Sequence, residues 1–239
     1  MLQSTVNGVN GSKGASPLVA VSFAASITGY ITHPKGETLG SLRDRYQLEW
    51  LRCQADALLF GAGTVRIDRR KIQIRQHPAL ADITAKFPAI FVVCTKNNFD
   101  FTTSFWDSEC EKNILLLGND SEQKIPNDKN ITLVQLGNNS SINDVISYIY
   151  GLGFNRILCE GGGKLFSSLV GENLVDELFL TLTPWIIDKG EQMNVSSIIS
   201  GPSLVKEVSL ISTTVQDKEV FLRYRFQNGR AWPKFEEIL

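Results

Sequence analysis

The segment best suited to chemistry in this 239-residue chain is residues 156–166, where a short apolar run leads into Glu160, three consecutive glycines and a helical pattern. A glycine loop between a strand and a helix directs backbone N–H groups and the positive helix end at an anion. Without side chains, it also lets a flat ring or a pyrophosphate lie against the backbone. The spacing matches neither G-x-G-x-x-G nor the P-loop, so a tight structural turn is the alternative. Glu160 favours a ligand site, because side chains at the C-terminal end of a parallel strand project into the ligand crevice.

Two further segments end a strand pattern in small residues. Residues 56–68 pass from an apolar run into two glycines and Thr64, and Asp68 and Arg75 follow. A carboxylate and a guanidinium at one mouth could recognise a phosphorylated ligand, because the planar fork of arginine matches phosphate. The alternative is a solvated surface. Residues 21–31 leave small side chains at the end of the first strand, which an ordinary turn explains equally well.

The elements that must position these residues are short apolar runs, which predict strands buried on both faces. The runs are residues 18–25, 57–60, 89–95, 113–117, 132–136, 156–159 and 178–182. Helical spacing at residues 42–53, 142–150 and 164–170 alternates with them, and Ser141 is a candidate N-cap. Alternating strands and helices predict a largely parallel sheet with helices on both faces.

The end of the chain has a different pattern. Residues 208–214 and 220–226 are β-rich runs around a short polar connection, which predicts a C-terminal antiparallel hairpin. The expected fold class is therefore α/β, with a mostly parallel mixed sheet. Residues 1–16 are polar and glycine-rich and predict a flexible N-terminal tail before a single domain at residues 17–239.

Composition and charge exclude several functions. The formal net charge is −1 with mixed signs, so nothing supplies the basic stripe that nucleic-acid binding needs. The N-terminus lacks a signal-peptide pattern and no apolar run approaches about 18 residues, which predicts a cytoplasmic protein without a membrane partner. The four cysteines, Cys53, Cys94, Cys110 and Cys159, form no C-x-x-C pair and predict buried, inert thiols. His33 and His77 are expected at the surface, and no metal site is expected.

Taken in order, the segments resemble the pyrimidine reductases of riboflavin biosynthesis, whose three-layer fold is similar to that of dihydrofolate reductase. The resemblance spans residues 17–226 and is most specific at residues 61–68, at residues 160–163, and at residues 174–178 followed by Thr183-Pro184. It implies NADPH as the cofactor and a small phosphorylated molecule as the substrate. No His-x-Glu with Pro-Cys-x-x-Cys deaminase signature occurs in the sequence, so a reductase alone is expected.

The resemblance also implies roles for individual residues. Cofactor contacts fall at Ala25, Thr64, Asp68, Thr95, Gly161, Gly162, Gly163, Lys164 and Leu165. Substrate contacts fall at Thr38, Arg52, Ile72, Arg75 and Glu160. Asp68 and Glu160 are the implied catalytic residues, which orient the reacting groups and relay a proton through water. A homodimer is expected from the resemblance and from the apolar run 179–187, which contains Trp185.

The sequence departs from the family pattern at four places. Thr28 replaces an aspartate, Arg69-Arg70 replaces Asp-Pro and adds positive charge at the mouth, residues 39–41 shorten a segment that carries a tryptophan, and Gly163 replaces a proline. Because these changes bear on the substrate, a reductase of the same fold acting on a pterin or another heterocycle is one alternative. A nucleotide-binding module without catalysis is the other.

Overall fold

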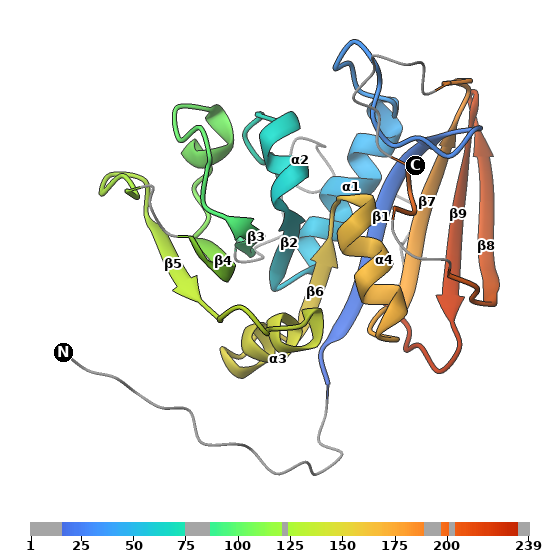
Figure 1. Cartoon of the computed structure of the whole chain (residues 1–239). Coiled ribbons are helices and arrows are strands. Elements are labelled where there is room, and N and C mark those ends of the chain that lie inside the picture. The colour runs from blue at the N-terminus through green and yellow to red at the C-terminus, as the bar shows by residue number, and fades with distance from the viewer. Residues whose placement is uncertain (1–15, 75–86, 121–123, 189–196, 201–203, 234–239) are drawn as a thin grey trace.

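A nine-stranded sheet forms the middle of the molecule in a computed structural model, which describes residues 16–74, 87–120, 124–188, 197–200 and 204–233 (Figure 1). The strand order is β5-β4-β3-β2-β6-β1-β7-β9-β8. The strands are β1 Leu18–Ser26, β2 Ala57–Gly61, β3 Ala89–Lys96, β4 Lys112–Asp120, β5 Ile131–Gln135, β6 Arg156–Cys159, β7 Glu177–Thr183, β8 Val208–Gln216 and β9 Glu219–Phe226. The helices are α1 Leu42–Gln54, α2 Ala62–Ile67, α3 Ile142–Gly151 and α4 Gly163–Gly171, with a 3-10 turn, η2, at Ser104–Asp107.

The mixed sheet is confirmed. The first seven strands in this spatial order, from β5 through β1 to β7, pair in parallel. The hairpin β8–β9 then adds to β7 in the antiparallel direction. The C-terminal ends of the parallel strands therefore lie along one edge of the sheet. This edge is where ligands of open α/β sheets bind.

Helices cover both faces of the sheet, as the alternation of patterns predicted (Figure 1). On one face, Trp50 and Leu51 of α1 pack with Leu58 of β2 in one core cluster. On the other face, side chains of α3 and α4, among them Ile146 and Leu169, form a second cluster with the sheet. Complete burial of each such side chain contributes about 1.5–3 kcal/mol, so the two cores hold the strand ends in place.

Capping fixes where the helices begin. The Ser41 hydroxyl accepts hydrogen bonds from the N–H groups of Arg43 and Asp44 at the start of α1. The predicted cap Ser141 forms a reciprocal capping box with Asp144 at the start of α3. Helix α4 differs, because its N-cap, Gly162, has no side chain to accept from the first turn. Its leading N–H groups therefore have no side-chain cap.

Two expectations about burial are wrong. Strand β5, expected to be buried on both faces, is the edge strand of the sheet and has only half-buried or exposed side chains, because nothing pairs with its outer side among the described residues. His33, expected at the surface, has a side chain that is only 11% exposed, because its ring packs against Trp185 at 5.3 Å between centroids. His77 and nearly all of the predicted tail lie outside the described residues.

The expectation that the cysteines are buried is confirmed. All four cysteines are buried and none of them forms a disulfide. Burial raises the pKa of the Cys159 thiol to about 12, so this thiol is no nucleophile at neutral pH. Among the described residues, no helix has both the length and the apolar character needed to span a bilayer.

Candidate active site

The glycine loop lies where the ends of β2 and β6 meet. The Glu160 N–H donates to the Leu59 carbonyl at 3.0 Å, and the Gly61 N–H donates to the Gly161 carbonyl at 3.1 Å. These two bonds continue the β2–β6 ladder past the last paired residues. These bonds fix the loop at the C-terminal ends of the parallel strands, and α4 follows the loop directly in the chain.

Glycine is required in the loop for two physical reasons. Gly161 and Gly162 have φ values of +152° and +91°, which side chains with a Cβ rarely adopt. A Cβ on Gly161 would also lie 2.8 Å from the Thr64 hydroxyl oxygen, whereas one on Gly162 would find it at 3.4 Å. Thr64 of α2 therefore packs directly on the loop. That Thr64 and the loop bind the same ligand stays a prediction.

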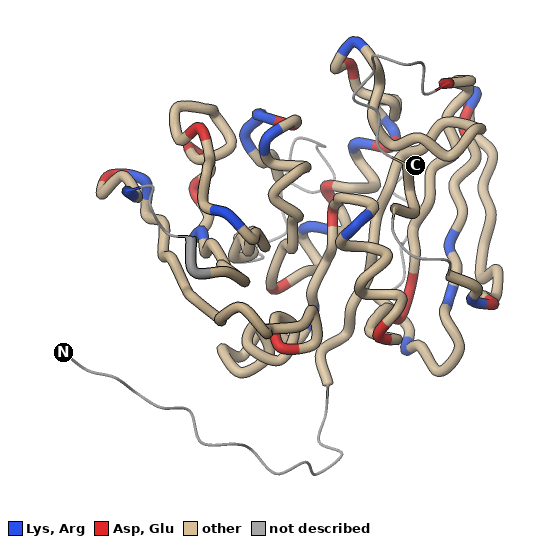
Figure 2. The backbone as a smooth tube through the Cα atoms, in the orientation of Figure 1, with Lys and Arg blue, Asp and Glu red and all other residues tan. Residues whose placement is uncertain are grey.

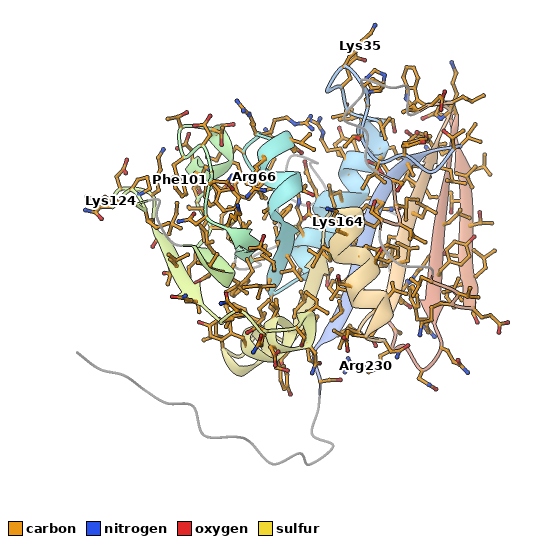
Figure 3. All side chains as sticks on the ribbon, in the orientation of Figure 1. Lys35, Arg66, Phe101, Lys124, Lys164 and Arg230 are labelled. Atoms are coloured by element: carbon orange, nitrogen blue, oxygen red, sulfur yellow. The ribbon has the colours of Figure 1, made fainter. Side chains whose placement is uncertain are left out.

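The loop suits a pyrophosphate better than a bulky group. Gly161 and Gly163 are buried and Gly162 is half-buried, so a ligand can approach the loop at Gly162, beside the positive start of α4, which has no side-chain cap. Lys164, on the first turn of α4, has an exposed side chain (Figure 3), whereas Leu165 is buried. The predicted cofactor residues at 161–165 and Thr64 thus come together in one place.

Arg52 and Glu160 form the strongest electrostatic contact at this edge. The Arg52 Nε and Nη2 donate to the two carboxylate oxygens of Glu160 at 2.7 and 2.6 Å. A third donor, Nη1, bonds the Gln73 carbonyl at 2.8 Å. Burial lowers the pKa of Arg52, but the charge of Glu160 and its hydrogen bonds more than offset this and leave the pKa above its ordinary value. The guanidinium of Arg52, one of the predicted substrate contacts, is therefore directed at Glu160.

Asp68 lies at the end of α2, within electrostatic reach of Arg52. Its side chain is 47% exposed and pairs with Arg70 at 2.7 Å. Arg69 in turn lies 3.7 Å from Asp100. Arg69 and Arg70, which replace Asp-Pro, thus each have an acidic partner. They therefore add less unpaired positive charge near the site than the sequence suggested.

The other predicted residues are spread along the same edge and its surroundings. Ala25 is buried at the end of β1, and Thr95 is exposed near the end of β3. Thr38 is exposed in the loop before α1. Ile72 is half-buried against the aromatic core, where its N–H donates to Ser108 at 3.1 Å. Arg75 lies outside the described residues.

Sequence reasoning missed the contacts that brace this edge. The Thr28 hydroxyl, which stands where a carboxylate was expected, donates to the Ile187 carbonyl at 2.6 Å and accepts from the Ile187 N–H at 3.0 Å. Residues 197–200 cover the start of α4, because a Cβ on Gly163 would lie 2.1 Å from the Ser197 carbonyl oxygen. No local pattern signals either contact, since both join segments far apart in the sequence.

A half-buried acidic group at the start of α1, Asp44, was also missed. Burial raises the pKa of Asp44 from 3.8 to about 6, and the nearby carboxylate of Glu219 adds to this rise. Glu219 itself is buried and accepts two hydrogen bonds from Ser41. This cluster connects α1 to the β8–β9 hairpin.

The acidic residues of the third matching motif have a structural role. Glu177 is fully buried and pairs with Arg223 at 2.6 Å and Arg225 at 2.8 Å. Asp176 accepts from the N–H of Val19 at 2.8 Å and of Arg230 at 2.7 Å. They lie at the start of β7, the end opposite the glycine loop.

No group of three or more histidine, cysteine or acidic side chains in the described part of the chain could hold a metal ion.

Comparisons with known proteins agree with this architecture. The profile of a family described as the RibD C-terminal domain matches residues 17–221. The 2,5-diamino-6-ribosylamino-4(3H)-pyrimidinone 5′-phosphate reductase of Archaeoglobus fulgidus is 25% identical over 199 residues, which cover 80% of this chain and 90% of that protein.

Two solved structures share the fold. A pyrimidine reductase-like protein of Corynebacterium diphtheriae superposes with a TM-score of 0.72 at 19% identity, over 89% of this chain and 92% of that one. The riboflavin biosynthesis reductase of Saccharomyces cerevisiae superposes with a TM-score of 0.65 at 15% identity, over 91% of this chain and 93% of that one. The three-layer α/β fold is thereby confirmed.

Proposed function

The chain belongs to the RibD C-terminal domain family of riboflavin-biosynthesis pyrimidine reductases, and from this premise we propose that it uses NADPH to reduce the ribosyl group of a phosphoribosylaminopyrimidine to a ribityl group. The observation that carries the proposal is the meeting of three features at one sheet edge. These are a bare glycine loop, an uncapped helix start and a buried carboxylate held by a guanidinium. The relatives named as pyrimidine reductases support the substrate class.

The proposed chemistry needs a hydride and a proton. When bound, NADPH supplies the hydride to C1′ of the open-chain imine form of the ribosylamino group, and a proton completes the reduction at the imine nitrogen. Residues 161–165 and Thr64 would hold the pyrophosphate of the cofactor. Glu160, fixed in direction by Arg52, accepts a hydrogen bond from a sugar hydroxyl or from the nicotinamide carboxamide. Asp68 lies exposed at the end of α2, where water can carry a proton to the substrate.

The substrate phosphate needs a cationic partner, because a dianion that leaves water must be paired. Arg52 is already engaged by Glu160, so Arg75 is the first candidate. We expect Arg75→Lys to raise KM for the phosphorylated substrate about ten-fold, which is about 1.4 kcal/mol, with NADPH affinity nearly unchanged. Steady-state kinetics with varied substrate, together with NADPH titration, measure both quantities. An unchanged KM would show that a residue other than Arg75 binds the substrate phosphate.

The experiment that tests the function is oxidation of NADPH against a panel of phosphoribosylaminopyrimidines and pterins. We expect turnover with a phosphoribosylaminopyrimidine and formation of the ribityl product. Turnover only with a pterin would assign the chain to another reductase activity of the same fold. Tight NADPH binding without turnover on any member would favour a nucleotide-binding module.

A further inference from the structure

Arg66 differs from the other cations at the end of α2, because its partners are neutral. Its Nη2 donates to the Lys96 carbonyl at 3.2 Å and to the Asn98 side-chain oxygen, and its guanidinium lies 5.0 Å from the centre of the Phe99 ring. Figure 3 shows Arg66 on α2 near the segment after β3 that carries Phe101. Among the described residues, no carboxylate pairs with Arg66.

The neighbouring cations are each neutralised. Figure 2 shows lysine and arginine gathered at the end of α2 and in the turn that follows. The pairs are Arg69 with Asp100 at 3.7 Å, Arg70 with Asp68 at 2.7 Å and Lys71 with Glu109 at 3.5 Å. Arg66 is thus the cation of this turn that can meet an external anion without first giving up an acidic partner.

The guanidinium is also held in a fixed position. Phe99 is buried and packs edge-on against Trp106, with ring centroids 5.3 Å apart, so the surface under Arg66 is rigid. Both of these hydrogen bonds come from Nη2, which leaves the Nε and Nη1 donors for another acceptor. Each of these donors can give one charge-assisted hydrogen bond to a phosphate oxygen.

The position of Arg66 fits one end of the proposed cofactor. Strands β3, β2 and β6 are adjacent in this order, and strands lie about 4.8 Å apart, so the end of β3 is about 10 Å from the glycine loop. In NADPH the ribose that bears the 2′-phosphate is joined directly to the pyrophosphate. With the pyrophosphate on residues 161–163 and the adenosine half directed toward β3, this ribose would come within reach of the end of β3. Lys96 lies there with an exposed side chain, and it forms no ion pair with any described residue.

We propose that Arg66, with Lys96 as a second cation, binds the 2′-phosphate of NADPH and makes the chain prefer NADPH to NADH. The proposal rests on the proposed function, because it assumes that the glycine loop holds the pyrophosphate. It assigns cofactor choice to a turn separate from the Arg52–Glu160 pair. A purely structural Arg66 would only fasten α2 to the turn after β3.

The test is a set of dissociation constants measured by isothermal titration for NADPH, NADH, 2′,5′-ADP and 5′-AMP. We expect the unmodified protein to bind NADPH and 2′,5′-ADP more tightly than their counterparts that lack the phosphate. Arg66→Gln should weaken NADPH and 2′,5′-ADP about ten-fold or more, which is about 1.4 kcal/mol, and leave NADH and 5′-AMP unchanged. Arg66→Lys should lose part of this preference, and Lys96→Gln should lose less than Arg66→Gln.

Arg69→Gln is the matched control, because it removes the same charge from the same turn but from a paired side chain. An equal loss of NADPH affinity in this control would overturn the assignment to Arg66. Equal weakening of NADPH and NADH in Arg66→Gln, with a lower melting temperature, would show a structural role instead. If the unmodified protein binds both cofactors equally, the inference fails and the proposed function stands. If it binds neither, the proposed function fails and the inference fails with it.

Discussion

At the scale of single residues, the site depends on positions where a side chain is excluded. We predict that Gly161→Ala abolishes NADPH binding and lowers the melting temperature, because the added Cβ meets Thr64 at 2.8 Å and the backbone has a positive φ. Gly171→Ala, at the other end of α4, meets nothing within 4 Å and should leave binding unchanged. Calorimetry and NADPH titration of both variants measure this contrast, and normal binding by Gly161→Ala would remove the loop from the site.

The Arg52–Glu160 pair gives a second prediction. Glu160→Gln leaves the guanidinium of a nearly buried arginine without its counter-charge, so we expect the free energy of unfolding to fall by about 3 kcal/mol. Asp68→Asn removes the partner of an exposed arginine and should change it by less than about 1 kcal/mol. Urea unfolding at neutral pH measures the free energy of unfolding of both variants. Equal losses in both variants would mean that burial does not distinguish the pairs.

At the scale of elements, the start of α1 makes stability depend on pH. The folded-state pKa of Asp44, about 6, lies above the ordinary 3.8, so the unfolded chain ionises first as the pH rises. Below pH 3.8, Asp44 is protonated in both the folded and the unfolded chain and does not change the free energy of unfolding. Between pH 3.8 and about 6 it ionises only in the unfolded chain, which lowers the free energy of unfolding. A shift of about two units corresponds to about 3 kcal/mol at pH 7.

We predict that Asp44→Asn removes this penalty. Its free energy of unfolding should exceed that of the unmodified protein at pH 7 and match it near pH 4, as measured by urea unfolding across that range. An advantage that stays constant from pH 4 to pH 8 would assign the effect to packing and not to ionisation.

The elements themselves were largely predictable because their signals are local. Apolar runs such as residues 89–95 and the cap at Ser141 depend on neighbours in sequence, and the structure extends these elements by only a few residues. The edge position of β5 was not predictable, because it depends on strand order. The Thr28–Ile187 contact was missed for the same reason, since it joins residues 159 positions apart.

The candidate site was predictable in part. The glycine loop, Thr64 and Glu160 could be placed at one edge, because parallel strands end together. The engagement of Arg52 by Glu160 could not, because α1 and the end of β6 are 108 positions apart at these residues. Arg66 carried no motif, and only its neutral partners in the structure distinguish it from its paired neighbours.

At the scale of the whole molecule, we propose a homodimer. The apolar run 179–187 supports this less than expected, because Phe179 and Ile187 are buried and only Trp185 and Ile186 are notably exposed. The edge strand β8 supports it better, since its apolar side chains Leu210, Ile211 and Val215 are exposed at a free sheet edge.

We predict a dimer mass at micromolar concentration in light scattering after gel filtration. Ile211→Lys should shift the protein toward the monomer, because it places a charge in the apolar face of β8. Val205→Lys is the control, since Val205 is also apolar and is more exposed than Ile211 but lies before the strand. A monomer in the unmodified protein would exclude the dimer, and equal effects of both variants would exclude β8 as its surface.

The central claim is that the sheet edge with the glycine loop carries hydride transfer to a ribosyl carbon. Reaction of the protein with NADPH deuterated at C4 of the nicotinamide and a phosphoribosylaminopyrimidine tests it most directly. The account predicts a ribityl product with one deuterium at C1′, seen by NMR, and loss of this product in Gly161→Ala. A product without the label, or a label at any other carbon, would contradict it.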